Sequence, residues 1–154
     1  MKRTVHLVAG ILATSVIATF FTSTVLVELF GSFDAVTKVK ALIVTPGLWI
    51  LIPAIAATGG SGFTLSQSRQ GRLVENKKKR MPFIAANGIF VLVPSAIFLN
   101  LWAAQGIFDT RFYLVQGLEL LAGAVNLSLM GLNIRDGLRL SGRLRHNKPL
   151  EPTR

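Results

Sequence analysis

Apolar residues of this chain gather in four blocks, and polar residues gather between the blocks. Each block is about twenty residues long, which is the length that crosses the ~30 Å hydrocarbon core of a bilayer at a rise of about 1.5 Å per helical residue. A soluble domain of 154 residues would instead distribute charged residues through its helices. The pattern therefore predicts an all-α, polytopic membrane protein whose transmembrane helices cover residues 4–29, 35–57, 82–105 and 110–138.

The connections between the blocks predict how the helices are arranged. The residues from Gly31 to Asp34 are of types that favour turns, so they are expected to form the first turn. The glycine-rich stretch from Gly59 to Gly62 is expected to end the second helix. A polar, basic loop is expected from there to Arg80. Short connections make consecutive helices antiparallel neighbours, so we expect an antiparallel four-helix bundle in a single domain over residues 1–138. Prolines inside the helices are expected to bend them, namely Pro46, Pro53 and Pro94.

The positions of the basic residues, which give the chain a net charge of +10, indicate its orientation in the membrane. Of 17 basic residues, 14 lie at the N-terminus, in the central loop or in the C-terminal region. Lys and Arg remain on the cytoplasmic side of bacterial inner membranes. We therefore predict an N-in, C-in orientation, a basic cytoplasmic tail over residues 139–154, and no nucleic-acid partner. The apolar run from Leu7 to Val27 exceeds the length of a signal-peptide core, so it is expected to be a retained helix.

The last apolar block carries a line of polar side chains on one helical face. Gln116, Glu119, Asn126 and Asn133 are separated by three, seven and seven residues. Polar groups within hydrocarbon are costly unless partners receive them. This face is therefore expected to lie against the bundle interior or a subunit contact, with Asn87 or Ser95 of the third helix, or Thr14 or Ser15 of the first, as partners for Asn126.

Glu119 is the sharpest candidate for chemistry, because it is a carboxylate one to two turns inside the fourth helix. Lys40 enters the second helix from the same side of the membrane, so a Glu119–Lys40 ion pair is expected. Such a pair either fixes the register of the helices or supplies a protonatable or ligand-binding charge. Glu28 lies near the outer surface and is expected to be solvated.

A haem site is the alternative chemistry. His6 lies one turn before Gly10, and a small residue beside an imidazole leaves space for the edge of a porphyrin. Met130, or His6 of a second copy, would supply the second axial ligand of a b-type haem. The chain has no cysteine, which excludes disulfides and thiolate metal sites, and no catalytic or metal-binding motif is apparent.

Two stretches of the chain carry a resemblance. Residues 80–88 (Arg-Met-Pro-Phe-Ile-Ala-Ala-Asn-Gly) and residues 116–137, with Gln116, Glu119, Asn126 and Asn133, resemble uncharacterised small four-helix inner-membrane proteins of Gram-negative bacteria. The likeness covers most of the chain. It implies a bacterial inner-membrane location and, because that family has no established activity, nothing about chemistry.

Three functions are consistent with these features. The first is a non-enzymatic binding or transport module built around the polar face of the fourth helix. The second is an accessory subunit that packs against a larger membrane complex, which Trp49 in mid-span and a line of small residues on the first helix both fit. That line, which equally suits contact with a second copy in a homodimer, contains Gly10, Thr14, Ala18 and Thr22. The third is a haem b electron-transfer protein that uses His6.

Overall fold

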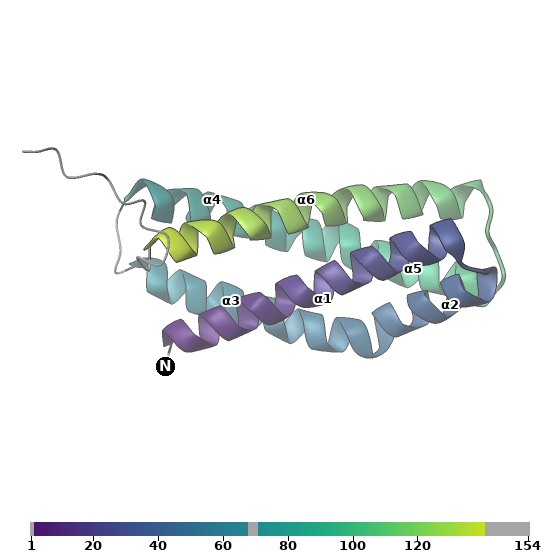
Figure 1. The fold of residues 1–154 in the computed structure, drawn as a ribbon, viewed down its shortest axis with the longest axis horizontal. Helices are drawn as coiled ribbons and strands as arrows, with labels where there is room; N and C mark the ends of the chain where they lie inside the picture. Colours follow the sequence, from purple (N-terminus) through teal and green to yellow (C-terminus); the bar gives the residue numbers. More distant parts are fainter. Residues whose placement is uncertain (1, 68–70, 141–154) are drawn as a thin grey trace, which may run out of the picture.

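The computed structural model describes residues 2–67 and 71–140, and in them the chain forms four helical rods without any strand (Figure 1). The second rod is interrupted by a kinked segment, and the third by a short π-helical segment. In chain order the rods are α1 (Lys2–Phe30); α2 (Phe33–Leu42), η1 (Ile43–Leu48) and α3 (Trp49–Gln67); α4 (Arg72–Asn87), η2 (Gly88–Leu92) and α5 (Val93–Ala104); and α6 (Thr110–Leu140).

Consecutive rods run antiparallel and form a bundle (Figure 1). The turn end of the bundle holds the connections at residues 31–32 and 105–109, and the loop end holds the opposite ends of the rods. In the half near the turn end, α2 packs against α1 and α5, and α6 also packs against α1 and α5. The helices α2 and α6 are therefore diagonal neighbours, and a side chain that joins them must cross the bundle interior.

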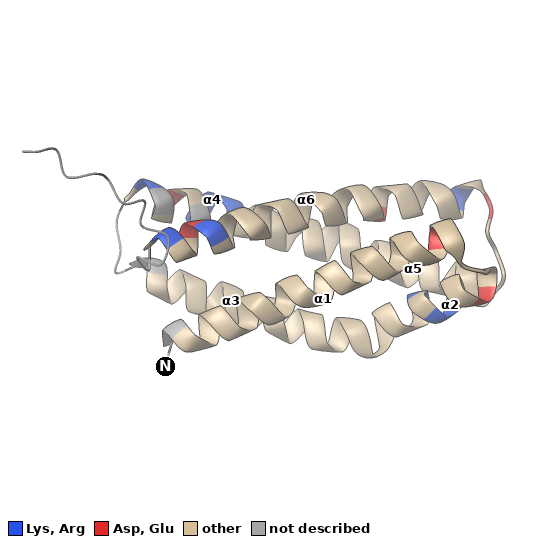
Figure 2. Cartoon of the chain, viewed as in Figure 1, with Lys and Arg blue, Asp and Glu red and all other residues tan. Residues whose placement is uncertain are grey.

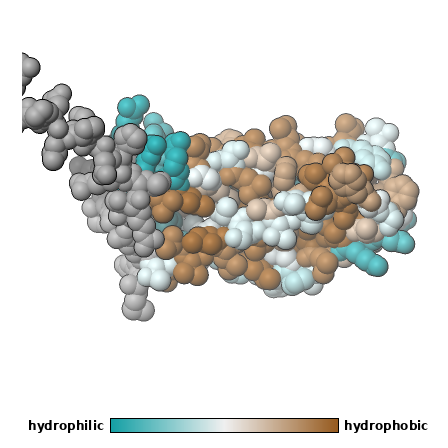
Figure 3. Space-filling model, viewed as in Figure 1, coloured by the Kyte–Doolittle hydropathy of each residue, from teal (hydrophilic) through white to brown (hydrophobic). Residues whose placement is uncertain are grey.

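The surface of the bundle is apolar between its ends. Each rod contains a stretch long and apolar enough to span a membrane, with mean hydropathies between 1.4 and 2.0. No more than 28% of any of these stretches is buried inside the bundle, so most of the apolar side chains face outward. Figure 3 shows hydrophobic residues over the middle of the visible face and hydrophilic residues towards the two ends. The predicted polytopic four-helix bundle is confirmed.

The second rod is longer than predicted and is broken in its middle. Its backbone leaves helical geometry at Thr45 (φ −136°, ψ 113°), just before Pro46, as a proline inside a helix favours. The expected helix end at residue 57 is wrong, because α3 continues to Gln67. Side-chain hydroxyls in α3 find partners within the helix itself; Thr58 Oγ1, for example, donates to Ala54 O at 2.7 Å.

The third rod also begins earlier than predicted. Residues 72–81 were expected to be loop, but they form the first turns of α4, and Pro82 lies inside that helix. Leu, Glu, Lys, Arg and Met have high helix propensity, so the charged segment continues the helix beyond the apolar stretch. A bend was expected at Pro94, and the irregular segment η2 lies on the N-terminal side of that proline and ends two residues before it.

The first and fourth rods begin and end within two residues of their predicted bounds. The fourth begins at Thr110, where Asp109 Oδ1 accepts hydrogen bonds from the backbone N–H groups of Arg111 and Phe112 and so caps the helix. It continues to Leu140, two residues beyond the predicted domain boundary at 138. The rest of the predicted tail, residues 141–154, lies outside the described residues.

Two apolar clusters fill the bundle interior. Each combines residues of several rods, so together they hold the bundle along its length. The cluster nearer the loop end contains Ala13, Ile17, Leu48, Leu51, Ala54, Ile84 and Met130. The cluster nearer the turn end contains Val36, Leu99, Ala103 and Phe112. On both the second and the fourth rod, charged or polar residues fall between the members of the two clusters.

Candidate functional site

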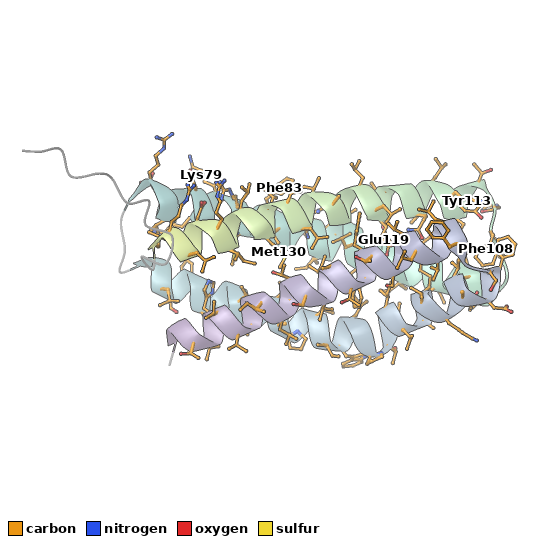
Figure 4. The ribbon with its side chains drawn as sticks, viewed as in Figure 1. Lys79, Phe83, Phe108, Tyr113, Glu119 and Met130 are labelled. Atoms are coloured by element: carbon orange, nitrogen blue, oxygen red, sulfur yellow. The ribbon has the colours of Figure 1, made fainter. Side chains whose placement is uncertain are left out.

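The polar line predicted on the fourth helix faces the bundle interior. Gln116, Asn126 and Asn133 are buried, and Asn126 is fully so. Figure 4 shows Glu119 and Met130 on the side of α6 that faces α1. In contrast, outward residues of the same helix such as Leu114 and Leu121 are more than 60% exposed. The helical spacing of the polar residues is the reason they share one face.

The first polar group of this face is an ion pair across the diagonal of the bundle. Lys40 Nζ of α2 donates to Glu119 Oε2 of α6 at 2.6 Å. The lysine side chain is fully buried, and the glutamate side chain is 13% exposed. Gln116 Nε2 donates to the same Oε2 at 3.0 Å, so one carboxylate oxygen receives two donors. The pair expected from the sequence is therefore present, with Gln116 as its third member.

Glu28 lies close to this pair, which the sequence alone did not indicate. Its carboxylate interacts electrostatically with both Lys40 and Glu119. Its Oε1 atom is buried, and no hydrogen-bond donor among the described residues reaches it. The expectation that Glu28 is solvated is thus wrong for this oxygen. The reason is the diagonal course of Lys40, whose ammonium group lies in the interior where α1 packs against α2 and α6.

These residues lie well inside the bundle. Glu119 follows the start of α6 by nine residues, which corresponds to a depth of about 13 Å from the turn end. Lys40 follows the start of α2 by seven residues, or about 10 Å. Figure 2 shows that acidic and basic residues otherwise gather at the two ends of the rods. The apolar cluster around Phe112 separates the site from the turn end.

A second polar contact lies near the middle of the bundle. Asn87 Nδ2 of α4 donates to Asn126 Oδ1 at 2.8 Å and to Ala122 O at 3.0 Å. Asn126 Nδ2 in turn donates to Ile84 O at 3.3 Å. Of the partners that the sequence suggested for Asn126, Asn87 is the one the structure brings to it. This reciprocal pattern is that of polar contacts that hold membrane helices together.

The polar face ends in a buried ion pair that sequence reasoning missed. Arg80 Nη1 donates to Asp136 Oδ2 at 2.7 Å, and the Asp136 side chain is only 2% exposed. Asn133 lies one turn before Asp136, and its Nδ2 lies 3.7 Å from Met81 Sδ. The signal was available, because three residues beyond Asn133 the same helical face reaches Asp136.

The structure separates the candidate site residues into distinct groups. Lys40, Gln116 and Glu119 are together, whereas Asn126 and Asn133 each contact α4. Seven residues separate Glu119 from Asn126, which is about 10 Å along the helix. The polar face is therefore a series of contacts with different helices, and only its first part contains a charged interior site.

His6 and Met130 lie in different surroundings. His6 Nδ1 is 3.0 Å from Thr58 O and 3.2 Å from Ser61 Oγ, and its ring packs where Gly62 lacks a side chain. Met130 packs in the apolar cluster nearer the loop end. The methyl group of Thr58 lies against Gly10, 3.6 Å from where a Cβ atom would stand, so this arrangement does not favour the haem alternative. A visible spectrum of the purified protein tests it, since a colourless protein from haem-replete cells ends it.

Comparisons with protein-family models, with curated proteins and with solved structures find no match to this chain. The physical features of the chain therefore carry the assignment. Four rods have the length and apolarity of transmembrane helices, their apolar side chains face outward, and their polar side chains pair inside. The protein is a multi-pass integral membrane protein with a four-helix bundle fold.

Proposed function

We propose that this protein is a non-enzymatic binding or transport module, and that Lys40, Gln116 and Glu119 form its charged interior site. The observation that supports this most is the complete burial of Lys40 against Glu119. Replacing a buried ion pair by apolar residues is often neutral or stabilising, so the fold alone does not require such a pair. Ionisable groups inside membrane segments typically belong to ion pathways, proton relays or ligand contacts.

Interruptions of two rods near the polar residues support a site that can open. The segment η1 begins three residues after Lys40, and η2 begins directly after Asn87. Discontinuous helices form the binding sites of many transporters, and π-helical segments are frequent at functional sites. Movement at these two interruptions would change the surroundings of the charged site while the uninterrupted helices α1 and α6 stay in place.

Glu119→Gln is expected to abolish proton-coupled flux. The test reconstitutes the protein in vesicles that contain a pH-sensitive dye and measures the decay of an imposed pH gradient. The wild type should dissipate the gradient faster than protein-free vesicles, and the variant should return to the protein-free rate, because the amide does not alternate between a protonated and an ionised form. Glu75→Gln, at an exposed position of α4, is the matched control and should retain the flux.

Two results would count against this proposal. An unaltered, pH-dependent flux in the Glu119→Gln variant would remove Glu119 from the mechanism. A wild-type rate no faster than that of protein-free vesicles would contradict proton-coupled transport itself.

A role as an accessory subunit is the second candidate, and one surface feature favours it. A shallow hollow on α1 is lined by mostly small side chains: Ala18, Thr19, Thr22, Ser23 and Leu26. Small residues allow membrane helices to approach closely, so this hollow suits a helix of another subunit. Native mass measurement of the detergent-purified protein tests the idea, and a clean monomer or isolated homodimer would argue against a larger complex.

The proposed orientation is N-in and C-in in a bacterial inner membrane. Exposed basic residues gather at the loop end, among them Arg72, Lys79 and Arg139, as the positive-inside rule requires (Figure 2). Because the chain has no cysteine, single cysteines report orientation directly. In intact spheroplasts a membrane-impermeant maleimide should label Asp34→Cys at the turn end but not Lys79→Cys. The opposite labelling would invert the topology.

A further inference from the structure

We propose that Glu28 belongs to the same interior site, and that Glu28, Lys40, Gln116 and Glu119 together bind one exchangeable proton. This inference rests on the proposed function, since it names the ligand of that site. The four residues come from three helices, α1, α2 and α6, whose packing brings them together. They are called the proton site below.

Two buried acceptor atoms in the proton site lack a donor. Gln116 is 4% exposed, and its Nε2 points at Glu119, but no donor among the described residues reaches its Oε1. Glu28 Oε1 is in the same condition. A buried acceptor without a donor carries a desolvation cost, so both atoms indicate that the site takes up a hydrogen-bond donor. A proton supplies one, because it converts a carboxylate oxygen from an acceptor into a donor.

The charges of the site do not balance unless it binds one proton. Glu28 and Glu119 carry two negative charges when ionised, whereas Lys40 supplies one positive charge. A net charge is unfavourable in a medium of low dielectric constant, and two neighbouring carboxylates favour protonation of one of them. Uptake of one proton makes the site neutral. The reaction is reversible, forms one O–H bond on a carboxylate and requires no other reactant.

The helices that pack against α1 supply no further charge to balance the second carboxylate. From α2, Lys40 faces the site, whereas Lys38 and Asp34 are exposed. From α6, Glu119 faces it, whereas Arg111 is exposed and paired with Asp109. The helix α3 contains no charged residue at all. The ammonium group of Lys40 is thus the one cation that these helices direct into the site.

A proton suits this site better than a metal ion. Cations such as Ca²⁺ and Mg²⁺ take six or more oxygen ligands. The proton site offers fewer side-chain oxygens than that, and one of them, Glu119 Oε2, already receives the lysine and the glutamine. A metal ion would also lie beside the ammonium group of Lys40, which repels it. A proton needs only one oxygen.

Infrared spectroscopy of the protein in vesicles tests the inference, because a protonated carboxyl group has its own C=O stretching band. Exposed carboxylates are ionised at neutral pH, so the band reports interior groups. The wild type should show one such group at neutral pH, and the band should disappear when the pH is raised. Glu28→Gln and Glu119→Gln should each remove the band, because either change leaves Lys40 with a single carboxylate and a neutral site.

Two further variants sharpen the test. Lys40→Met should double the band, since two carboxylates then remain without a cation. Glu75→Gln should leave the band unchanged, because Glu75 is exposed on α4.

Repeating the measurement with sodium in place of a bulky organic cation should give the same spectrum. Loss of the band on addition of sodium would overturn the choice of a proton and assign the site to a metal cation.

The inference is overturned if the wild type shows no protonated carboxyl band at neutral pH, or if Glu28→Gln keeps it in full. These outcomes are distinguishable from failure of the proposed function, because the spectrum is an equilibrium measurement that needs no transport. A flux that depends on Glu119 together with a band unaffected by Glu28→Gln would reject Glu28 alone. A band that behaves as expected without any flux would reject transport and leave a proton-binding site.

Discussion

Replacing Lys40 by methionine is expected to lower the free energy of unfolding by about 3–5 kcal/mol, the range found when one partner of a buried ion pair is removed. The reason is that Glu119 loses its donor at 2.6 Å, so the carboxylates of the proton site are left without a cation and must take up protons to stay neutral, which costs free energy at neutral pH. The loss should shrink at acidic pH, because proton uptake from the solution then costs less free energy. Unfolding in mixed micelles by increasing amounts of a denaturing detergent measures the difference.

A double variant distinguishes loss of the ion pair from loss of packing by the lysine side chain. Lys40→Met combined with Glu119→Gln should recover a large part of the lost stability, since the glutamine carries no charge that needs a partner. Lys38→Met is the matched control, because Lys38 is exposed on the same helix, and its stability should be unchanged. Equal stability of the Lys40→Met and Lys38→Met variants would mean that Lys40 is not buried against Glu119.

Gly47→Ala is expected to destabilise the protein by about 3 kcal/mol, at the upper end of the usual cost of overpacking. A Cβ atom at this position would overlap Phe20 Cζ of α1 and would lie 2.9 Å from the backbone oxygen of Leu42. The phenyl ring can rotate away, but the carbonyl belongs to the last residue of α2, directly before the interruption, and can move only with the backbone. Thermal unfolding in detergent provides the measurement.

A glycine elsewhere in the same rod provides the comparison for this change. Gly59 lies inside α3, and no atom lies within 4 Å of a Cβ built there. Gly59→Ala should therefore leave stability equal or raise it by about 0.5–1 kcal/mol, because alanine has the higher helix propensity. If Gly47→Ala were as stable as Gly59→Ala, the close packing of the interrupted rod against α1 would be wrong.

The sequence predicted those features that depend on period and charge. Apolar blocks of membrane length predicted the rods, and separations of three and seven residues predicted the interior face that contains Gln116, Glu119 and Asn126. The Lys40–Glu119 pair followed from depth alone, because both residues lie at similar distances from the same end. These inferences need only the geometry of a single helix and the rule that buried charges seek partners.

The features that the sequence did not predict depend on packing between helices. Glu28 looked solvated because its distance from the membrane surface was judged along α1 only, whereas Lys40 approaches it from α2. The glycines at 59–62 looked like a helix end, but packing of His6 against Gly62 keeps that part of α3 beside α1. The Arg80–Asp136 ion pair was not predicted, because Arg80 was expected in a loop, whereas it lies in a helix that packs against α6.

The central claim is that four helices cross a bilayer and direct the polar face of α6 away from lipid. Spin labels on single cysteines in vesicles test it most directly, with oxygen as the probe of hydrocarbon and a nickel complex as the probe of water. Labels at Leu114→Cys and Leu121→Cys should collide readily with oxygen, whereas labels at Ala122→Cys and Met130→Cys should be protected from both probes. Equal oxygen access at positions 121 and 122, or ready access of the nickel complex to all four positions, would contradict the account.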